Sequence, residues 1–80
     1  MIIYDRLWET MKKKGISQYS LIKDYNINES QLHRLRKNMV IKTSTIDRIC
    51  EILDCEVEDI CQHIEDANTQ EYKTFKKFSQ

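Results

Sequence analysis

Proline is absent from this chain, and glycine occurs once, at Gly15. The tight turns of many-stranded sandwiches and barrels are rich in these two residues, so their scarcity argues against such folds. No apolar run approaches the ~20 residues of a membrane-spanning helix. The first six residues also lack the charged start and long apolar stretch of a signal peptide. We therefore expect an all-α, cytoplasmic protein that contacts no membrane.

The chain also lacks the motifs of common enzymes. It contains no glycine-rich phosphate loop and no paired catalytic carboxylates. A chain of 80 residues makes one small domain, which buries only roughly 60% of its unfolded surface and leaves little room for a large catalytic cleft. We expect a non-enzymatic protein that needs no cofactor and has no small-molecule substrate.

The three cysteines do not have the spacing of a metal or disulfide site. Structural zinc sites favour cysteine pairs separated by about two to four residues, whereas four and five residues separate Cys50, Cys55 and Cys61. An odd cysteine count also argues against a disulfide framework. Cys61 and His63 are two residues apart and would point in different directions on a helix, which makes them a poor nucleophile and base. We expect reduced core thiols and no metal.

The net charge is zero, but the charges are strongly segregated along the sequence. Residues 1–50 carry ten Lys or Arg against five Asp or Glu, a net of +5, whereas residues 51–71 carry eight acidic residues and no Lys or Arg. Lys73, Lys76 and Lys77 follow. Because binding follows the local field, a basic face can hold phosphates while an acidic face points elsewhere.

Residues 15–36 have the pattern of two short helices joined by a tight turn. Ser17 and Asn28 are helix-capping residue types, and each precedes a segment with apolar residues at helical spacing. Gln31 lies three residues after Asn28, the position of the reciprocal partner in a capping box. Asn26 lies between the segments, and Asn tolerates the left-handed backbone that a steep turn requires. The arrangement predicts a helix-turn-helix motif, which indicates DNA binding.

Helical periodicity continues on both sides of this motif. Gly15 favours the left-handed conformation that ends a helix, and we expect a similar stop at Asp54. We predict five helices: about residues 4–14, 18–24 and 29–37, one that Thr43 or Ser44 caps, and one marked by Val57, Ile60, Cys61 and Ile64.

The domain is expected to span residues 1–65. Residues 66–80 lose the apolar stripe and form a basic tail, in which Tyr72, Phe75 and Phe78 recur every third residue. Disorder is the default for such a tail. The alternative is a short helix or arm that docks on the domain or on a second subunit.

The third helix offers a polar face for a DNA groove. With Leu32 and Leu35 inward, its period of 3.6 residues places Ser30, His33, Arg34 and Lys37 outward and Glu29 and Gln31 on the flanks. Arg34 can donate two hydrogen bonds to guanine, Gln31 can pair with adenine, and Ser30 can bind bases or phosphate. Lys37, Asn38, Lys42 and Gln18 are placed to bind phosphates. Glu29 is open between accepting from a cytosine amino group and pairing with His33.

One set of residues resembles a known family. These residues are Gly15-Ile16-Ser17-Gln18, Leu21, Asn26-Ile27, Leu32, Leu35-Arg36-Lys37-Asn38, Thr45-Ile46, Ile49-Cys50-Glu51-Ile52-Leu53-Asp54-Cys55 and Asp59-Ile60. Over about residues 3–65 the chain resembles the lambda-repressor-like, Cro-type (XRE) helix-turn-helix proteins of phages and bacteria. The resemblance implies a compact five-helix fold, sequence-specific binding of double-stranded DNA, often as a homodimer on a palindrome, and transcriptional control.

The resemblance also implies which residues contact DNA. By position, contacts fall on the start of the second helix, on the third helix, and on backbone-binding residues near Asn38 and Thr43. Combined with the helix projection, the expected DNA-binding residues are Gln18, Asn28, Glu29, Ser30, Gln31, Arg34, Lys37, Asn38, Lys42 and Thr43.

The chain departs from the family pattern at three places. Ile22 stands where the family usually has Ala, and Asn26 stands for the usual turn glycine. Arg36 replaces an acidic residue, and its usual ion-pair partner in the first helix is Met11. We therefore expect Arg36 to reach a phosphate or to pair with Glu9.

Two functions compete with transcriptional regulation, for which repression is the favoured form. The first is a protein-interaction module, such as an antitoxin or antirepressor partner, that uses the acidic residues 51–71 or the tail. The second is binding of single-stranded nucleic acid, which lacks the exposed aromatic platform that it would need. We expect a homodimer on double-stranded DNA, because one helix reads too few base pairs for useful selectivity.

Overall fold

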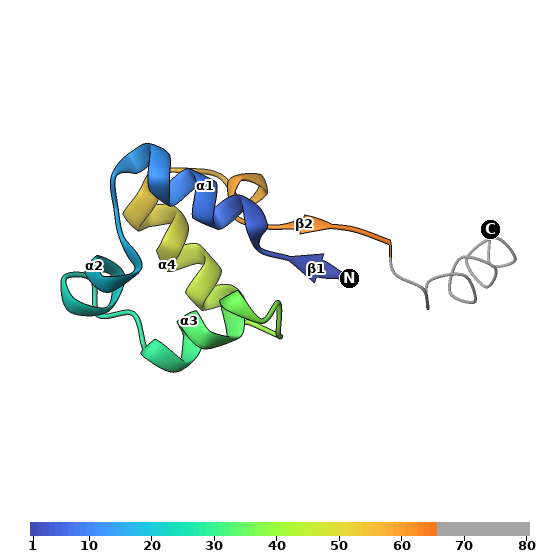
Figure 1. Cartoon of the computed structure of the whole chain (residues 1–80), viewed down its shortest axis with the longest axis horizontal. Coiled ribbons are helices and arrows are strands. Elements are labelled where there is room, and N and C mark those ends of the chain that lie inside the picture. Colours follow the sequence, from blue (N-terminus) through green and yellow to red (C-terminus); the bar gives the residue numbers. More distant parts are fainter. Residues whose placement is uncertain (66–80) are drawn as a thin grey trace, which may run out of the picture.

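Four α-helices form the body of the molecule (Figure 1). The computed structural model describes residues 1–65, in which α1 spans Asp5–Lys14, α2 Gln18–Lys23, α3 Glu29–Arg36 and α4 Thr43–Leu53. α1 packs against α4, and α2 and α3 lie on the lower side of this pair in Figure 1. The four predicted helices of residues 4–54 are thus confirmed, within one or two residues at their ends.

Left-handed residues end the two longest helices, as the sequence predicts. Gly15 has φ 70°, and its N–H donates to the carbonyl of Lys12, while the N–H of Ile16 donates to the carbonyl of Met11. Asp54, with φ 51°, ends α4. The expected cap of α4 is wrong by one or two residues, because Lys42 occupies the N-cap position without a side-chain cap hydrogen bond. Thr43 and Ser44 therefore lie inside the helix.

The core collects one apolar side chain or more from every helix. Leu7, Leu21, Leu32, Leu35, Ile49 and Ile60 are fully buried, and Tyr4, Met11, Ile27 and Leu53 join them. No polar or charged side chain within residues 1–65 is buried. Because the apolar stripes of all four helices meet here, the polar faces of α2 and α3 are left outward.

The predicted fifth helix is wrong. Residues Val57–Asp59 form a single 3-10 turn, η1, and Gln62–His63 form a strand, β2. β2 pairs antiparallel with Ile2–Ile3, β1, in the register Ile2 opposite His63 and Ile3 opposite Gln62. Val57, expected on an inward stripe, is 54% exposed. The domain is therefore mostly helical with a small two-stranded sheet, and the all-α, five-helix expectation is corrected to that extent.

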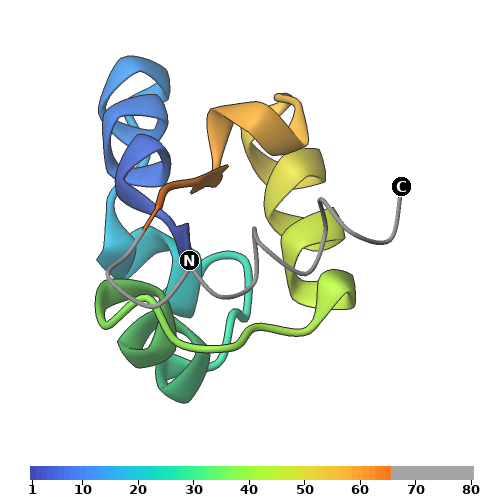
Figure 2. The same cartoon turned by 90° about the vertical axis from the view of Figure 1, so that its right-hand side faces the viewer.

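Contacts with the first fifteen residues explain why this segment is not helical. The side chains of Arg6 and Thr10 on α1 donate to the carbonyls of Glu58 and Asp59, at 3.1 and 2.7 Å. The N–H of Ile64 donates to the carbonyl of Met1, and the amino group of Met1 donates to the carbonyl of Ile64. These partners satisfy backbone carbonyls that a helix would have to satisfy internally. Figure 1 shows β1 and β2 extending beyond the helices on one side of the domain, and Figure 2 looks onto this end.

Within residues 1–65 no helix combines the length and apolarity that a bilayer crossing requires. The expectation for the tail, residues 66–80, lies outside the described residues.

Candidate nucleic-acid interface

Helix α2 and helix α3 meet as a helix-turn-helix whose caps are those the sequence predicts. The hydroxyl of Ser17 accepts from the N–H of Ser20 at 3.1 Å, and the side chain of Asn28 accepts from the N–H of Ser30 at 2.9 Å. Asn26 has φ 62°, so it takes the left-handed conformation between the helices. These three residues fix where α3 begins and the direction in which it leaves the turn.

Helix α3 buries one face and exposes the other. Leu32 and Leu35 are fully buried, whereas Ser30, His33, Arg34 and Lys37 are exposed. The orientation predicted from the helical period is therefore confirmed. The exposed face carries hydrogen-bond donors of the kind that bind base edges and phosphates.

Gln31 does not complete a capping box. Its side-chain oxygen Oε1 accepts from the hydroxyl of Thr45 at 3.3 Å, and the residue is half-buried between α3 and α4. This contact ties α3 to α4. It uses Oε1 as an acceptor and leaves the two N–H donors of Gln31 without a partner in residues 1–65.

Gln18 and Arg36 join the start of α2 to the end of α3. Nε of Arg36 donates to Oε1 of Gln18 at 2.8 Å. Within residues 1–65 the partner of Arg36 is therefore Gln18 and not the expected Glu9, while the expected phosphate contact of Arg36 stays a prediction. The contact also places the positive charge of Arg36 beside the start of α2.

Asn38 anchors the loop that follows α3. It has φ 54°, and its Oδ1 accepts from the backbone N–H of Tyr4 at 2.9 Å. The hydroxyl of Tyr4 in turn donates to the carbonyl of Met39 at 3.0 Å. Burial raises the pKa of Tyr4 above its usual value, so the phenol stays a donor. The sequence analysis placed Asn38 at a phosphate and missed this structural contact. The available signal was an Asn, a residue type that tolerates the left-handed conformation, directly before an apolar loop.

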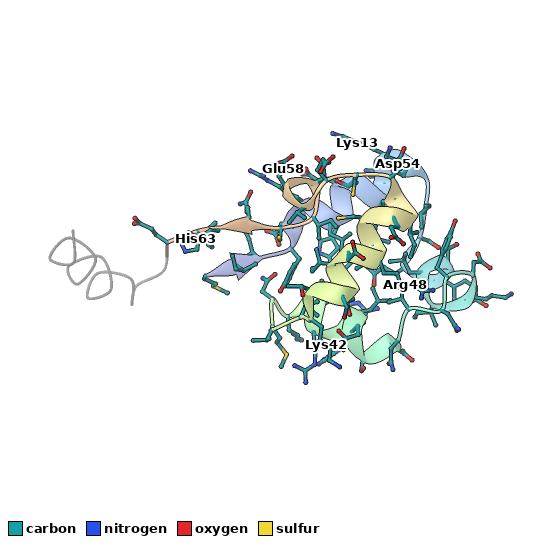
Figure 3. The ribbon with its side chains drawn as sticks, turned by 180° about the vertical axis from the view of Figure 1, so that it is seen from behind. Lys13, Lys42, Arg48, Asp54, Glu58 and His63 are labelled. Carbon is teal, nitrogen blue, oxygen red and sulfur yellow. The ribbon has the colours of Figure 1, made fainter. Side chains whose placement is uncertain are left out.

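The loop and the start of α4 add exposed donors beside α3. Lys42 and Thr43 are exposed, and Figure 3 shows Lys42 at the end of the domain opposite Glu58 and Asp54. Glu29 is exposed in the first turn of α3, where the helix dipole favours a carboxylate.

A hollow of about 370 Å³ lies between the turn that joins α2 to α3, the start of α3 and the first turns of α4. Its lining residues are Asn26, Ile27, Asn28, Gln31, Ser44, Thr45 and Arg48. Sequence reasoning missed Arg48, whose Nη2 donates to the carbonyl of Tyr25 in the helix-turn-helix. A basic residue on the outer face of α4 gives no local signal of this long-range contact.

The charges on this side are mainly positive. Five exposed Lys or Arg lie in α3, the following loop and α4, against three exposed acidic residues. The basic residues are Arg34, Arg36, Lys37, Lys42 and Arg48, and the acidic residues are Glu29, Asp47 and Glu51. The acidic side chains of residues 51–59 belong to the end of α4 and to η1. The field therefore favours an anion at α3.

The three cysteines are free and half-buried around the end of α4, which places them at the edge of the core and not inside it. Burial, first among several causes, raises the pKa of the Cys55 thiol to about 11 and raises that of Cys50. A protonated thiol is a weak nucleophile and a weak metal ligand. Within residues 1–65 no three His, Cys, Asp or Glu side chains are placed to hold a metal ion.

Comparisons with known proteins agree with this geometry. Residues 6–66 match the family described as Cro/C1-type HTH DNA-binding domain. The fold is similar to that of the crystal structure of transcriptional regulator VanUg, Form II, with a TM-score of 0.74 and 23% sequence identity over 81% of this chain and 87% of that chain. No curated protein sequence matches the chain.

Proposed function

The chain belongs to the Cro/C1-type helix-turn-helix (XRE) family of non-enzymatic DNA-binding domains, and on that premise we propose that it represses transcription by inserting α3 into the major groove of a specific duplex site. One observation carries the proposal: α3, which contacts α4 through Gln31 and α2 through Arg36, presents an exposed polar face with Arg34 at its centre. The structural relative is described as a transcriptional regulator, which supports the same role here.

Base reading falls to Arg34, Gln31 and Ser30. The exposed guanidinium of Arg34 has the fork that matches O6 and N7 of guanine. Thr45 holds the amide of Gln31, which reduces the side-chain entropy lost when Gln31 binds adenine. The hydroxyl of Ser30 donates to Oδ1 of Asn28 at 2.9 Å, and its oxygen can still accept from a cytosine amino group.

Phosphate binding falls to residues on either side of α3. On one side lies Gln18, held by Arg36, and on the other lie Lys37, Lys42 and Thr43. Asn28 and Glu29 stand at the start of α3, the first as the cap and the second as a base-reading or positioning residue. Asn38 contributes by fixing the loop, and its NH₂ group is the part left to bind phosphate.

The test compares two variants on a duplex selected from a random pool. Arg34→Ala is expected to weaken specific binding by about 1–3 kcal/mol and to relax the preference at one base pair. Lys13→Ala is the control, because Lys13 is exposed on α1, away from α3. Equal losses for the two variants, or no loss for Arg34→Ala, would refute the assignment.

We further propose that the protein binds DNA as a homodimer in the cytoplasm. One α3 covers too few base pairs for selectivity, and two copies related by a two-fold axis can read half-sites about one helical turn apart. Light scattering of the saturated complex should give two protomers per site. One protomer per site would refute the dimer and leave the binding mode of α3 intact.

A further inference from the structure

A second surface of the domain is apolar and does not belong to the face of α3. It is a groove of about 530 Å³ between β1, the start and outer face of α4, and η1. Its lining residues are Ile2, Tyr4, Ile41, Thr43, Ile46, Asp47, Cys50, Cys55, Glu56, Val57 and Cys61. Ile2 and Val57 are 46% and 54% exposed. Exposed apolar side chains that gather in one groove indicate a binding surface.

The described chain ends near one side of the groove. Ile2, which lines the groove, pairs with His63 of β2, and residue 66 follows His63 by three positions. Fifteen residues reach at most about 50 Å when extended and about 22 Å as a helix. A segment that starts three residues beyond the partner of Ile2 is therefore long enough to return to the groove that Ile2 lines.

The chemistry of the tail complements that of the groove. Tyr72, Phe75 and Phe78 recur at a spacing that places side chains on one face of a helix. Lys73, Lys76 and Lys77 lie among them, whereas Asp47 and Glu56 line the groove and no Lys or Arg does. A segment of this length is at most marginally helical in isolation, so a docking surface is what would order it.

We propose that residues 66–80 dock in this groove of their own chain, with aromatic side chains against Ile46 and Val57 and lysines beside Asp47 and Glu56. The docked tail covers the thiols of Cys50, Cys55 and Cys61, because all three line the groove. The groove includes no residue of α3, and the residue that it shares with the proposed DNA-binding set is Thr43, at the start of α4.

The cysteines provide the probe. The 80-residue chain is treated with iodoacetamide in the absence of DNA, and peptide mass spectrometry measures the rate at which each cysteine is alkylated. The triple variant Tyr72→Ser, Phe75→Ser, Phe78→Ser should react about tenfold faster than the wild type, because a tethered segment has a millimolar effective concentration and occupies its site most of the time. The matched control is Asn68→Ser, Gln70→Ser, Thr74→Ser, which should react at the wild-type rate.

Two further measurements make every outcome decisive. Circular dichroism, together with the alkylation rate measured in urea, identifies a variant that reacts quickly because it is unfolded. The triple variant Lys73→Glu, Lys76→Glu, Lys77→Glu should also be alkylated faster than the wild type while it stays folded, because its charges no longer complement those of the groove. The protection factor should not change with protein concentration. Equal rates in the aromatic variant and the wild type would overturn the proposal. Protection that rises with concentration would overturn docking in the same chain and assign the groove to a second copy.

Discussion

The helix-turn-helix and the end built from residues 1–10 and 56–64 are held together in different ways. In residues 17–37 the caps of Ser17 and Asn28 join groups two or three residues apart. At the other end, Met1 bonds to Ile64 across 63 residues, and Arg6 bonds to Glu58 across 52. Neighbouring residues fix the helix caps of the first region, whereas the second combines a local cap between Glu56 and Asp59 with contacts between distant parts of the chain.

The two ends also differ in charge and in surface chemistry. The side of α3 is basic and polar, whereas the opposite end is acidic around an apolar groove. The net charge of zero therefore hides two surfaces suited to different partners. An anion such as DNA suits the first, and a basic aromatic segment suits the second.

The largest expected effect tests whether the end held mainly by long-range contacts contributes less to the free energy of unfolding than the helix-turn-helix does. Ile60 follows η1 and is fully buried, as is Leu32 in α3. Ile60→Ala and Leu32→Ala should each lower the free energy of unfolding by about 2–5 kcal/mol, because both leave a cavity in one shared core. Urea denaturation measures both. Lys13→Ala, at an exposed position on α1, is the control and should change little. A loss near zero for Ile60→Ala would show that this end is not part of the cooperative core.

The next effect sharpens the contrast between local and distant anchors. Asn28→Ala removes the cap of α3 and should cost about 1 kcal/mol of stability. Glu56→Ala removes the cap of η1, because the side chain of Glu56 accepts from the backbone N–H of Asp59. Its cost should be smaller, because Arg6 and Thr10 still hold η1. Thermal unfolding of both variants decides the point, and a larger loss for Glu56→Ala would reverse the comparison.

The same contrast explains what the sequence could and could not predict. Gly15, Asn26 and Asp54 each have a residue type suited to the left-handed conformation that they adopt, so their turns were predictable. The strand Gln62–His63 was not, because its partner within residues 1–65 is β1, about 60 residues earlier in the chain. Val57, Ile60, Cys61 and Ile64 have helical spacing, but hydrogen bonds from α1 and β1 compete with that helix and win.

The candidate site also combines features that local sequence predicts with contacts that only the packing of helices determines. Exposure of Ser30 and Arg34 follows from the period of α3 and was predicted. The contacts of Arg36 with Gln18 and of Thr45 with Gln31 join different helices and depend on how these pack. Sequence periodicity gives the face of a helix, and not the residue that lies opposite it.

A smaller effect concerns the contact that joins α2 to α3. A double-mutant cycle with Gln18→Ala and Arg36→Ala should give a coupling of roughly 0.5 kcal/mol in stability, the low end for residues in contact, because the pair is exposed to solvent. Gln18→Ala with Lys37→Ala is the matched cycle without a contact and should be additive. Additivity in both cycles would contradict a defined link between the two helices.

A pH dependence is also expected at the acidic end. Burial raises the pKa of Cys55 from 9.0 to about 11, so the folded state binds a proton that the unfolded state has released. The stabilisation is complete below pH 9 and is lost as the pH rises through about 11. Cys55→Ala should therefore lose less stability than the wild type between these pH values in urea titrations. Parallel losses would show that the thiol ionises as it does in the unfolded chain.

The most direct test measures how salt changes the affinity of the 80-residue chain for its selected duplex. If α3 and the basic residues beside it bind DNA, log Kobs should fall linearly with log salt concentration, with a slope of about −0.9 for each phosphate contacted. Lys42→Ala should make the slope shallower by about one phosphate, and Lys13→Ala should leave it unchanged. A slope near zero, or an equal change for the two variants, would contradict DNA binding through α3.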